Sequence, residues 1–584
     1  MKLYDQLTNL WKHIRRRRRV QLIGVFTLTI FSTLGELASI GAIVPFLAAL
    51  TAPEVLLRDT SAQPILLSLG IEKSSQIIPF LTVFFAFAVV CAGFTRYLLM
   101  WAQTRLSFAI GADISAEIYQ RTLYQPYEVH LSRNSSEIIS AINLKVKDVI
   151  NQSIGPSITI VSAVFLLISI GIFLFFINPV VAAASFFLFG GIYFFVAVMV
   201  KKRLILHGDV MASKQNEVVR TLQEGLMGIR DVLLTNSQEV YLAAFRNADK
   251  PVRDATANII IISQAPRYAI EAAGMILIAV MAYVLVNVIG ETAVLPILGA
   301  LALGAQRMLP LLQQAYWSYS QMHGGQSTLN DVLQLLDQPL PEKFDKVKQV
   351  KFEKEIYLEK IEFCYENGRS SILNGINLRI HKGASIGIIG ETGSGKSTFV
   401  DLIMGLVPPT SGKFLVDGLK IGADELKGWQ KHIAHVPQSI YLTDASIAQN
   451  IAFGIKPEKI DMSRVMLAAQ KAQLHDVIES WQMKYETLVG EQGARLSGGQ
   501  RQRIGIARAL YREASLIVFD EATSALDSET EMAVMESIHT LDREITILII
   551  AHRINTLKRC DMILEIAKGK VSEKKFIDLC EVSY

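Results

Sequence analysis

The segment between Gly390 and Thr398 contains the residue types that bind phosphate groups. It directly follows the apolar run 385–389, and its residues are Gly390, Glu391, Thr392, Gly393, Ser394, Gly395, Lys396, Ser397 and Thr398. Glycines in this spacing let consecutive backbone N–H groups point at phosphate oxygens, and a following helix adds its positive N-terminal end. The lysine of such a loop reaches the β- and γ-phosphates, while the serine hydroxyl binds Mg²⁺. We therefore expect a nucleoside triphosphate site in which Lys396 and Ser397 take these roles.

Two neighbouring carboxylates follow another apolar run. The residues 516–519 have the character of a buried strand, and Asp520 and Glu521 come directly after them. We expect Asp520 at the tip of this strand near the metal, and Glu521 where it polarises the water that attacks the γ-phosphate. An apolar strand followed by two acids is common in proteins. This assignment therefore depends on the phosphate-binding loop in the same part of the chain.

A third motif points to a family. The run Leu496, Ser497, Gly498, Gly499, Gln500, followed by Arg501-Gln-Arg503, resembles the signature sequence of the ABC ATPases. The other motifs of that family occur in their usual order. The resemblance implies that Tyr365 stacks on adenine, that Gln438 senses Mg²⁺ and water, and that Asp527 lies in the loop after the catalytic Glu521. It also implies that His552 is the switch residue that contacts the γ-phosphate, and that Ser397, Gln438 and Asp520 surround the metal.

The same resemblance implies cooperation between subunits. In ABC ATPases the signature of one subunit closes on the phosphate loop of another, which would bring Ser497 and Gly499 to the γ-phosphate at the start of a helix. The sequence contains one phosphate loop and one signature, so we expect a dimer, with an identical subunit as the partner and with ATP and Mg²⁺ as cofactors. Residues 489–493 resemble the segment by which exporters of this family contact their membrane helices. The likeness covers about residues 15–575, and residues 568–584 depart from the family's ending.

Composition places part of the chain in a membrane. The 584 residues are 51% hydrophobic and only 19% charged, and the mean hydropathy is +0.33. The net charge of +4 is too small at this length for wholesale nucleic-acid binding. The four cysteines have no metal-binding spacing, which argues against a disulfide scaffold and a structural zinc site.

Long uncharged stretches predict six membrane-spanning helices. Residues 149–200 contain no Asp, Glu, Lys or Arg over 52 positions, which is too long for one span of about 20 residues. Asn178-Pro179 in the middle is a turn signal, so this stretch predicts a helical hairpin. The predicted spans are about 20–50, 77–107, 153–177, 179–200, 258–289 and 293–322. We therefore expect a multi-domain protein, with an all-α transmembrane domain over 1–336, a linker over 337–353, and an α/β P-loop domain with a helical subdomain over 354–584.

Basic residues indicate the orientation of the spans. The five arginines 15–19 precede the first span, and nine further Lys and Arg residues fill 201–253. Positive segments stay on the cytoplasmic side, so both termini and the P-loop domain are expected there, in a multi-pass protein of the cytoplasmic membrane. The arginine run could also be read as a nucleic-acid patch, but its place directly before an apolar segment favours the topological interpretation.

Three arginines fall inside otherwise apolar spans. Counting about 1.5 Å per residue from the outer ends puts Arg96 roughly 28 Å, Arg267 roughly 34 Å and Arg307 roughly 21 Å deep. An arginine at the bilayer centre costs about 3 kcal/mol on insertion scales, so each needs a partner, water or a function. In the structural interpretation Arg267 pairs with Glu271, Arg307 finds Glu36, and Arg96 extends to the inner interface. In the functional one, a basic ring accepts an anionic head group from the inner leaflet.

A second resemblance supports the functional interpretation. The segments 35–46, including Glu36, 264–268 and 306–310 look like the corresponding spans of flippases of lipid-linked oligosaccharides, and 64–70 like their short external helix. This likeness implies ATP-driven flipping of an amphipathic anionic lipid such as a polyprenyl-pyrophosphate oligosaccharide. The alternatives are a lipid A-like or multidrug exporter, and an ATP-gated channel or sensor on the same fold. Intact Glu521 and His552 favour turnover over gating.

Overall fold

The computed structural model describes most of the chain as two compact units. The described residues are 2–51, 74–177, 179–289, 291–340, 348–365, 371–522, 527–539, 544–551, 557–574 and 576. One unit comprises residues 1–125 and 130–340, and the other comprises residues 126–129 and 341–584. The predicted external helix at 64–70 and the end of the chain after residue 576 lie outside the described residues.

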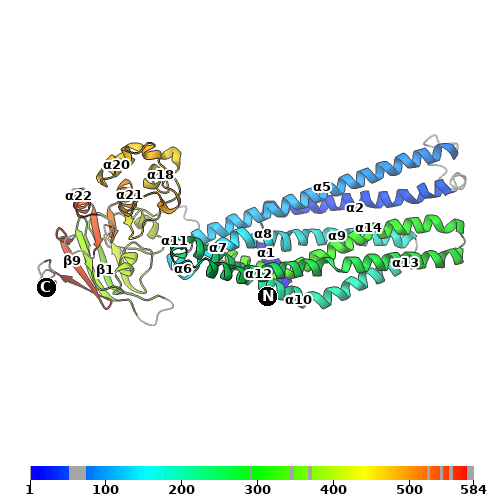
Figure 1. Cartoon of the computed structure of the whole chain (residues 1–584), viewed down its shortest axis with the longest axis horizontal. Helices are drawn as coiled ribbons and strands as arrows, with labels where there is room; N and C mark the ends of the chain where they lie inside the picture. Colours follow the sequence, from blue (N-terminus) through cyan, green and yellow to red (C-terminus); the bar gives the residue numbers. More distant parts are fainter. Residues whose placement is uncertain are drawn as a thin grey trace. The chain divides into compact units, whose positions relative to one another are not determined.

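Long helices form the first unit (Figure 1). The N-terminal half contains α1 (Leu3–His13), α2 (Arg16–Thr51), α5 (Ser74–Leu123), α7 (Ser135–Ser140), α8 (Val146–Val149) and α9 (Gly155–Ile177). The short helix α6 (Tyr127–Ser132) begins in the segment 126–129 that groups with the second unit. Two π-helical turns, η1 (Ala141–Lys145) and η2 (Ile150–Ile154), flank α8. The C-terminal half contains α10 (Pro179–Met227), α11 (Ile229–Leu234), α12 (Gln238–Gln264), α13 (Pro266–Ile289), α14 (Glu291–Gly324) and α15 (Gln326–Leu336).

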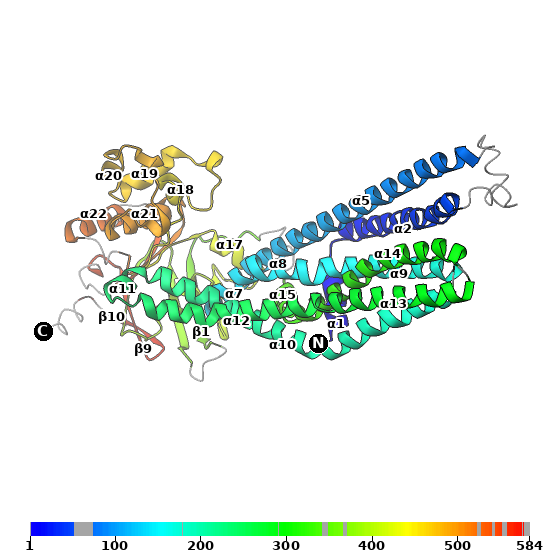
Figure 2. The same ribbon diagram turned by 45° about the vertical axis from the view of Figure 1, so that its right-hand side comes forward.

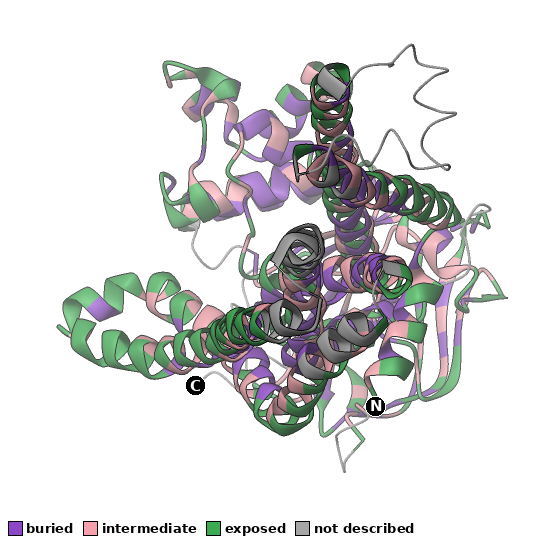
Figure 3. Cartoon of the chain, turned by 90° about the vertical axis from the view of Figure 1, so that its right-hand side faces the viewer, coloured by how far each residue is buried: buried purple, intermediate pink, exposed green. Residues whose placement is uncertain are grey.

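The helices pack in neighbouring pairs. Helix α2 runs beside α5, and α10 runs beside α12, as two views of the unit show (Figures 1 and 2). Buried positions lie mainly between the helices, whereas much of their outer surface is exposed (Figure 3). Many exposed side chains are large and apolar, such as Phe87 at 67% and Phe94 at 60% exposure on α5. Apolar groups on the outside are what a lipid-facing surface requires.

Three described ranges are long and apolar enough to cross a bilayer: Arg16–Leu47, Gln76–Leu123 and Ser135–Phe176. The turn predicted at Asn178-Pro179 agrees with the structure, since α9 ends at Ile177 and α10 begins at Pro179. The predicted segment 293–322 lies within α14, and 77–107 lies within α5. Two of these helices continue well beyond the predicted spans, since α5 ends at Leu123 and α10 ends at Met227.

The predicted single helix over 258–289 is wrong in one respect, because the structure divides it between α12 and α13 at Ala265. The physical reason is Pro266, which has no N–H to donate to the carbonyl of Ile262 four residues earlier. The hydroxyl of Tyr316 on α14 donates to that carbonyl at 3.0 Å instead. The break is therefore compensated by a side chain from a neighbouring helix.

Two β-sheets form the core of the second unit. The antiparallel sheet has the order β2-β1-β4-β5, from β1 (Glu355–Phe363), β2 (Leu373–His381), β4 (Ser411–Val416) and β5 (Leu419–Lys420). The other sheet has the order β10-β9-β3-β8-β7-β6 and is parallel apart from its β9–β10 pair. Its strands are β3 (Ser385–Ile389), β6 (Ile433–Val436), β7 (Leu516–Asp520), β8 (Thr546–Ile550), β9 (Met562–Ala567) and β10 (Lys570–Lys574).

Helices complete this unit. Helix α16 (Lys396–Ile403), α17 (Leu426–Gln430) and α22 (Ser528–His539) pack with the strands, and Trp429 is fully buried among them. A separate cluster contains α18 (Ile447–Ile451), α19 (Met462–Lys471), α20 (His475–Glu479) and α21 (Gly498–Tyr511), and it lies beside the strands in Figure 1. Three 3₁₀ turns accompany it: η3 (Pro457–Lys459), η4 (Lys484–Glu486) and η5 (Glu491–Gly493). This arrangement agrees with the expected α/β domain with a helical subdomain.

Candidate phosphate site and membrane arginines

The glycine-rich loop lies between β3 and α16, as a phosphate-binding loop requires. Gly390 has φ +149° and Gly395, the residue before α16, has φ +102°. A Cβ at Gly390 would lie 2.3 Å from the carbonyl oxygen of Ile566 on β9. Only glycine fits this position, because any side chain would collide with backbone. Glu391, Thr392 and Gly393 are exposed at the tip of the loop.

Lys396 curls back over this loop. Its Nζ donates to the carbonyl oxygens of Gly390 at 2.6 Å and Glu391 at 2.9 Å. Ser397 follows at the first turn of α16 and is exposed, whereas Thr398 is buried. The lysine cation, an exposed hydroxyl and the N-terminal end of an eight-residue helix thus meet at one place. These groups fit the phosphates of a nucleotide.

The predicted acidic pair lies at the end of β7. Asp520 is its last residue, and Glu521 follows with φ +49°. The side-chain amide of Gln438, just after the neighbouring strand β6, donates to Glu521 Oε2 at 2.6 Å. The structure therefore brings together two residues that are 83 positions apart in sequence. His552 and residues 524–526 lie outside the described residues.

Electrostatics at this strand end favour a bound cation. Burial, followed by the charge of Glu521, raises the pKa of Asp520, and Lys396 partly offsets this. Burial, followed by the charge of Asp520, raises the pKa of Asp401 on α16 to about 6. Within the described residues no group of three or more His, Cys, Asp or Glu side chains could hold a metal by itself.

Tyr365, the predicted adenine contact, follows β1 and is half-buried. Its ring meets that of Phe363 edge to face, with centroids 4.9 Å apart. Residues 366–370 after it are outside the described part. Phe363 thus fixes the place of the Tyr365 ring close to the end of the strand.

The signature segment forms the start of α21. Ser497 is its N-cap: the Ser497 hydroxyl accepts from the Gln500 N–H at 3.2 Å, and the Gln500 side chain accepts from the Ser497 N–H at 2.9 Å. Leu496 is buried and anchors the turn, whereas Gly498 is exposed. The first N–H groups of a helix have no partner within the helix. Those of Gly498 and Gly499 can therefore bind an anion.

Asp527 caps another helix. Its Oδ2 accepts from the Thr530 N–H at 3.0 Å at the start of α22. This hydrogen bond is the main cause that lowers the pKa of Asp527. The carboxylate therefore stays ionised at neutral pH.

Two of the three membrane arginines pair with carboxylates. Arg96 Nη1 on α5 lies 3.2 Å from Glu36 Oε1 on α2, and Arg267 Nε on α13 lies 2.7 Å from Glu271 Oε1 one turn later. The predicted Arg267–Glu271 pair is confirmed. Arg96, which we expected to extend to the inner interface, contacts Glu36 instead, and the expected Arg307–Glu36 contact stays a prediction. Arg307 belongs to α14, but its side chain is outside the described part of the structure.

Two features near the site were missed from the sequence. Residues 126–129 group with the second unit, and burial followed by the charges of Asp401 and Tyr365 raises the pKa of Tyr127. Asp401 itself was overlooked. Pro126 after a long helix was an available signal for the first feature. Asp401 could have been found from its spacing, because it lies four residues after Ser397 and therefore on the same face of α16.

Comparisons with known proteins agree with this architecture. The description "ABC transporter transmembrane region" matches residues 22–297, and "ABC transporter" matches residues 373–524. The ATP-dependent lipid A-core flippase of Haemophilus ducreyi is 28% identical over 83% of this chain and 84% of that protein. The flippase of the same description from Burkholderia orbicola is 28% identical over 97% of this chain and 92% of its own length.

A toxin exporter and a solved structure are also similar. The leukotoxin translocation ATP-binding protein LktB of Mannheimia glucosida is 38% identical, but over only 47% of this chain and 38% of that protein. The structure of a bacterial Atm1-family ABC exporter with ATP bound has a TM-score of 0.80 at 21% identity, covering 97% of this chain and 98% of the other. That likeness extends the shared fold over both units.

The two family matches cover separate parts of one polypeptide, and each part has the fold and motifs described above. A transmembrane region is thus joined to an ATP-binding hydrolase domain. The chain belongs to the ABC transporters, as a membrane-embedded half-exporter that couples ATP hydrolysis to transport.

Proposed function

We propose that this protein flips an amphipathic, anionic lipid-linked molecule, such as a polyprenyl-pyrophosphate oligosaccharide, across the cytoplasmic membrane. It works as a dimer of identical subunits, with the ATPase domains and both termini in the cytoplasm. Each subunit crosses the membrane six times, through α2, α5, α9, α10, the broken helix α12–α13, and α14. The observation that carries the substrate class is the pair of partly exposed arginines on α5 and α13.

Both arginines keep hydrogen-bond donors for a further anion. A guanidinium has five N–H donors. Arg96 approaches Glu36 through Nη1, and Arg267 approaches Glu271 through Nε. The two side chains are 43% and 57% exposed in the single subunit, while Glu36 is only 1% exposed. The carboxylates therefore hold the guanidinium groups in an apolar bundle and leave part of each free to meet a phosphate.

In the ATPase domain we assign the roles from the motifs, and the contacts described above support them. Lys396 and the loop backbone hold the phosphates, and Ser397, Gln438 and Asp520 would hold Mg²⁺, which would supply further charge neutralisation. Glu521, oriented by Gln438 at 2.6 Å, accepts the proton of the attacking water. The partner's signature segment completes the site through its helix N-terminus, and the family resemblance assigns Asp527 and His552 to the surroundings of the γ-phosphate.

A charge cycle at Arg267 and Glu271 tests the substrate role. Arg267→Gln removes the cation and leaves the Glu271 carboxylate without its ion-pair partner. The double variant with Glu271→Gln removes both charges. If the arginine binds substrate phosphate, flipping of a fluorescent polyprenyl-pyrophosphate glycan in vesicles stays low in both variants while basal ATP hydrolysis persists. If the pair is only structural, the double variant recovers flipping and stability together, and the proposed substrate role is wrong. The exposed Arg246→Gln on α12 is the matched control.

A lipid A-like substrate is the second candidate, because the two similar flippases over most of the chain carry that description. Both candidates present an anionic head group on hydrocarbon chains. Supplying each lipid in the same vesicles and comparing substrate-stimulated, vanadate-sensitive ATP hydrolysis separates them. Stimulation by neither lipid would favour a multidrug exporter or a gated channel instead.

A further inference from the structure

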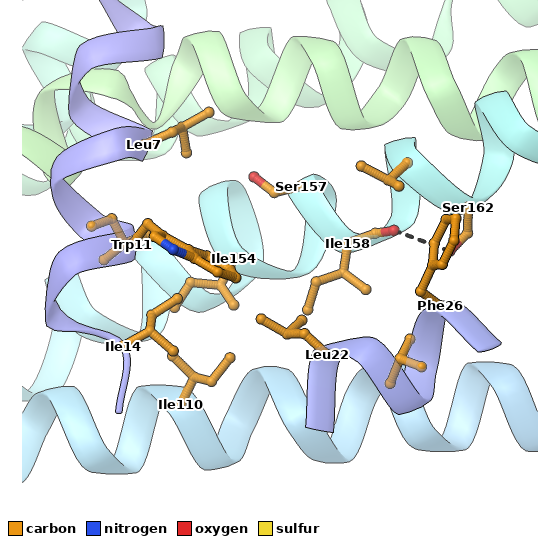
Figure 4. A pocket seen from close by; sticks show the side chains of 13 residues that line it. Leu7, Trp11, Ile14, Leu22, Phe26, Ile110, Ile154, Ser157, Ile158 and Ser162 are labelled. Atoms are coloured by element: carbon orange, nitrogen blue, oxygen red, sulfur yellow. Dashed lines mark hydrogen bonds between the residues drawn. The ribbon is translucent and has the colours of Figure 1, made fainter. Parts of the chain in front are cut away.

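A cavity of about 360 Å³ lies in the helical unit, between α1, α2, α5 and the start of α9 (Figure 4). Its floor is formed by side chains that are at most 8% exposed, among them Leu10, Ile14 and Ile110. Its rim includes Trp11 at 46% and Phe26 at 43% exposure. The cavity is therefore closed at the bottom and open at the side. Its volume is within the range of about 300–1,000 Å³ that is usual for ligand pockets.

Apart from the indole N–H of Trp11, which is 46% exposed at the rim, the polar side-chain groups of the lining have partners within the protein. The two hydroxyls in it belong to Ser157 and Ser162. Ser157 Oγ donates to the Ser153 carbonyl at 2.6 Å, and Ser162 Oγ donates to the Ile158 carbonyl at 3.2 Å. Gln103 also donates to Ser162 Oγ at 2.8 Å. An apolar cavity of this kind holds hydrocarbon in preference to water.

The cavity lies where three predicted spans meet the cytoplasmic boundary of the membrane. Leu22 and Val25 are in the first turns of the span 20–50, and Ser157 and Ile158 are in the first turns of the span 153–177. Ile110 follows the cytoplasmic end of the span 77–107. The cavity therefore lies at the level of the acyl chains of the cytoplasmic leaflet in the predicted topology. Acyl chains of membrane lipids are the apolar groups that are available at this level of the membrane.

The neighbouring arginines divide into two groups. Arg15 and Arg18 contact Asp113, at 3.6 and 2.8 Å. Arg19 lies over the Trp11 ring at 5.3 Å and donates to three carbonyls at the end of α1, so it holds that helix in place. Arg16 and Arg17, in the first turn of α2, are exposed and form no ion pair with any described residue. They present positive charge at the start of the helix whose Leu22, Val25 and Phe26 line the cavity.

We propose that this cavity binds one acyl chain of an anionic phospholipid of the cytoplasmic leaflet, whose phosphate contacts Arg16 and Arg17. The apolar lining selects the chain, and the exposed guanidinium groups select the anionic head group. The bound lipid fills the space beneath α1 and packs it against α2 and α9. This site is separate from the membrane arginines of the proposed transport function. Lipid binding there does not depend on which substrate is transported.

Photo-crosslinking of the full chain tests the proposal. The protein is placed in phosphatidylcholine nanodiscs with a small fraction of phosphatidylglycerol that carries a diazirine in one acyl chain, and adducts are mapped by peptide mass spectrometry. We expect adducts in the peptides that contain residues 7–26 and 154–162. Ser157→Phe fills the cavity and should remove them. The exposed Thr82→Phe on α5 is the matched control and should keep them.

Head-group selection is measured in the same way. Replacing both Arg16 and Arg17 by Gln should lower labelling by phosphatidylglycerol about fivefold per arginine and leave labelling by a phosphatidylcholine probe unchanged. The Lys variants, which keep the charge, should retain labelling, as should the control Arg246→Gln. Ile158→Phe serves as a second filling variant if Ser157→Phe does not fold. Equal labelling by both lipids, or unchanged adducts in a folded filling variant, would overturn the proposal.

Discussion

At the scale of single residues, the hydrogen bond from Gln438 to Glu521 at 2.6 Å orients the carboxylate that we propose as the base for the attacking water. A glutamine at position 521 can keep that hydrogen bond but cannot accept a proton. We therefore expect Glu521→Gln to bind ATP and to lose about 10²–10⁴-fold in turnover. Lys396→Ala should weaken nucleotide binding itself, because the cation that meets the phosphates is gone. Steady-state ATPase rates and binding of a fluorescent nucleotide measure the two effects. Near wild-type turnover in Glu521→Gln would show that another group is the base.

Asp401 gives a second prediction at this scale. Its pKa of about 6 lies above the ordinary value of 3.8, because burial and Asp520 oppose its charge. The ionised carboxylate therefore destabilises the folded domain above pH 6, and this penalty fades as the pH falls towards 4. Asp401→Asn should raise the free energy of unfolding by on the order of 1 kcal/mol at pH 7.5, allowing for partial exposure.

The measurement is the melting temperature of the nucleotide-free protein at pH 7.5 and pH 5. The difference between Asp401→Asn and wild type should be a few degrees at the higher pH, at about 2–4 °C per kcal/mol, and smaller at the lower pH. A difference that does not change with pH would mean that the substitution acts through packing and not through charge.

The local motifs of the ATPase domain could be predicted from sequence because each works within a few consecutive residues. The loop at 390–398 and the cap at Ser497 are examples, since their geometry depends on neighbouring backbone. The Arg96–Glu36 pair could not be predicted, because it depends on how far α5 is displaced along α2. The sequence was compatible both with arginines that pair with carboxylates and with arginines that bind an anionic head group. Because Arg96 and Arg267 are now found paired, any binding of a head group by them must occur alongside these ion pairs.

At the scale of elements, close helix contacts depend on glycine. A Cβ added at Gly208 on α10 would lie 2.1 Å from the carbonyl oxygen of Gly324, the last residue of α14. Backbone cannot move aside as a side-chain tip can. Gly208→Ala should therefore separate the two helices and cost about 1–3 kcal/mol, the range for overpacked cores.

Gly191 in the same helix is the matched control. A Cβ there has nothing within 4 Å, so Gly191→Ala should be neutral or should stabilise the helix by up to about 1 kcal/mol. The fraction of protein that remains monodisperse in detergent after heating measures both variants. Equal thermal loss in the two would mean that the α10–α14 approach does not limit stability.

The same elements show what sequence patterns omit. Long uncharged stretches predicted the long helices, and the local breaker Asn178-Pro179 predicted the break between α9 and α10. It did not predict the π-helical turns at 141–145 and 150–154, whose extra residue per turn is set by packing. One such packing contact is the ion pair between Lys145 in the first π turn, 3% exposed, and Asp331 on α15.

At the scale of the whole molecule, the composite ATP site predicts how defective subunits combine. When Lys396→Ala subunits join Ser497→Arg subunits, one site of the heterodimer carries both defects and the other carries neither. Each parent homodimer has two defective sites. Heterodimers isolated through two different affinity tags should therefore hydrolyse more ATP than either parent, because one intact site is restored.

The matched control places the same two substitutions in one subunit and pairs it with a wild-type subunit. In a composite arrangement each site then contains one defect, so activity should stay as low as in the parents. If each subunit instead built its site alone, the outcomes would be reversed: the wild-type subunit of the control would remain active and the first heterodimer would be inactive. The comparison holds the number and type of substitutions constant and changes only their distribution. It therefore tests whether Ser497 of one chain acts on the nucleotide held by Lys396 of the other.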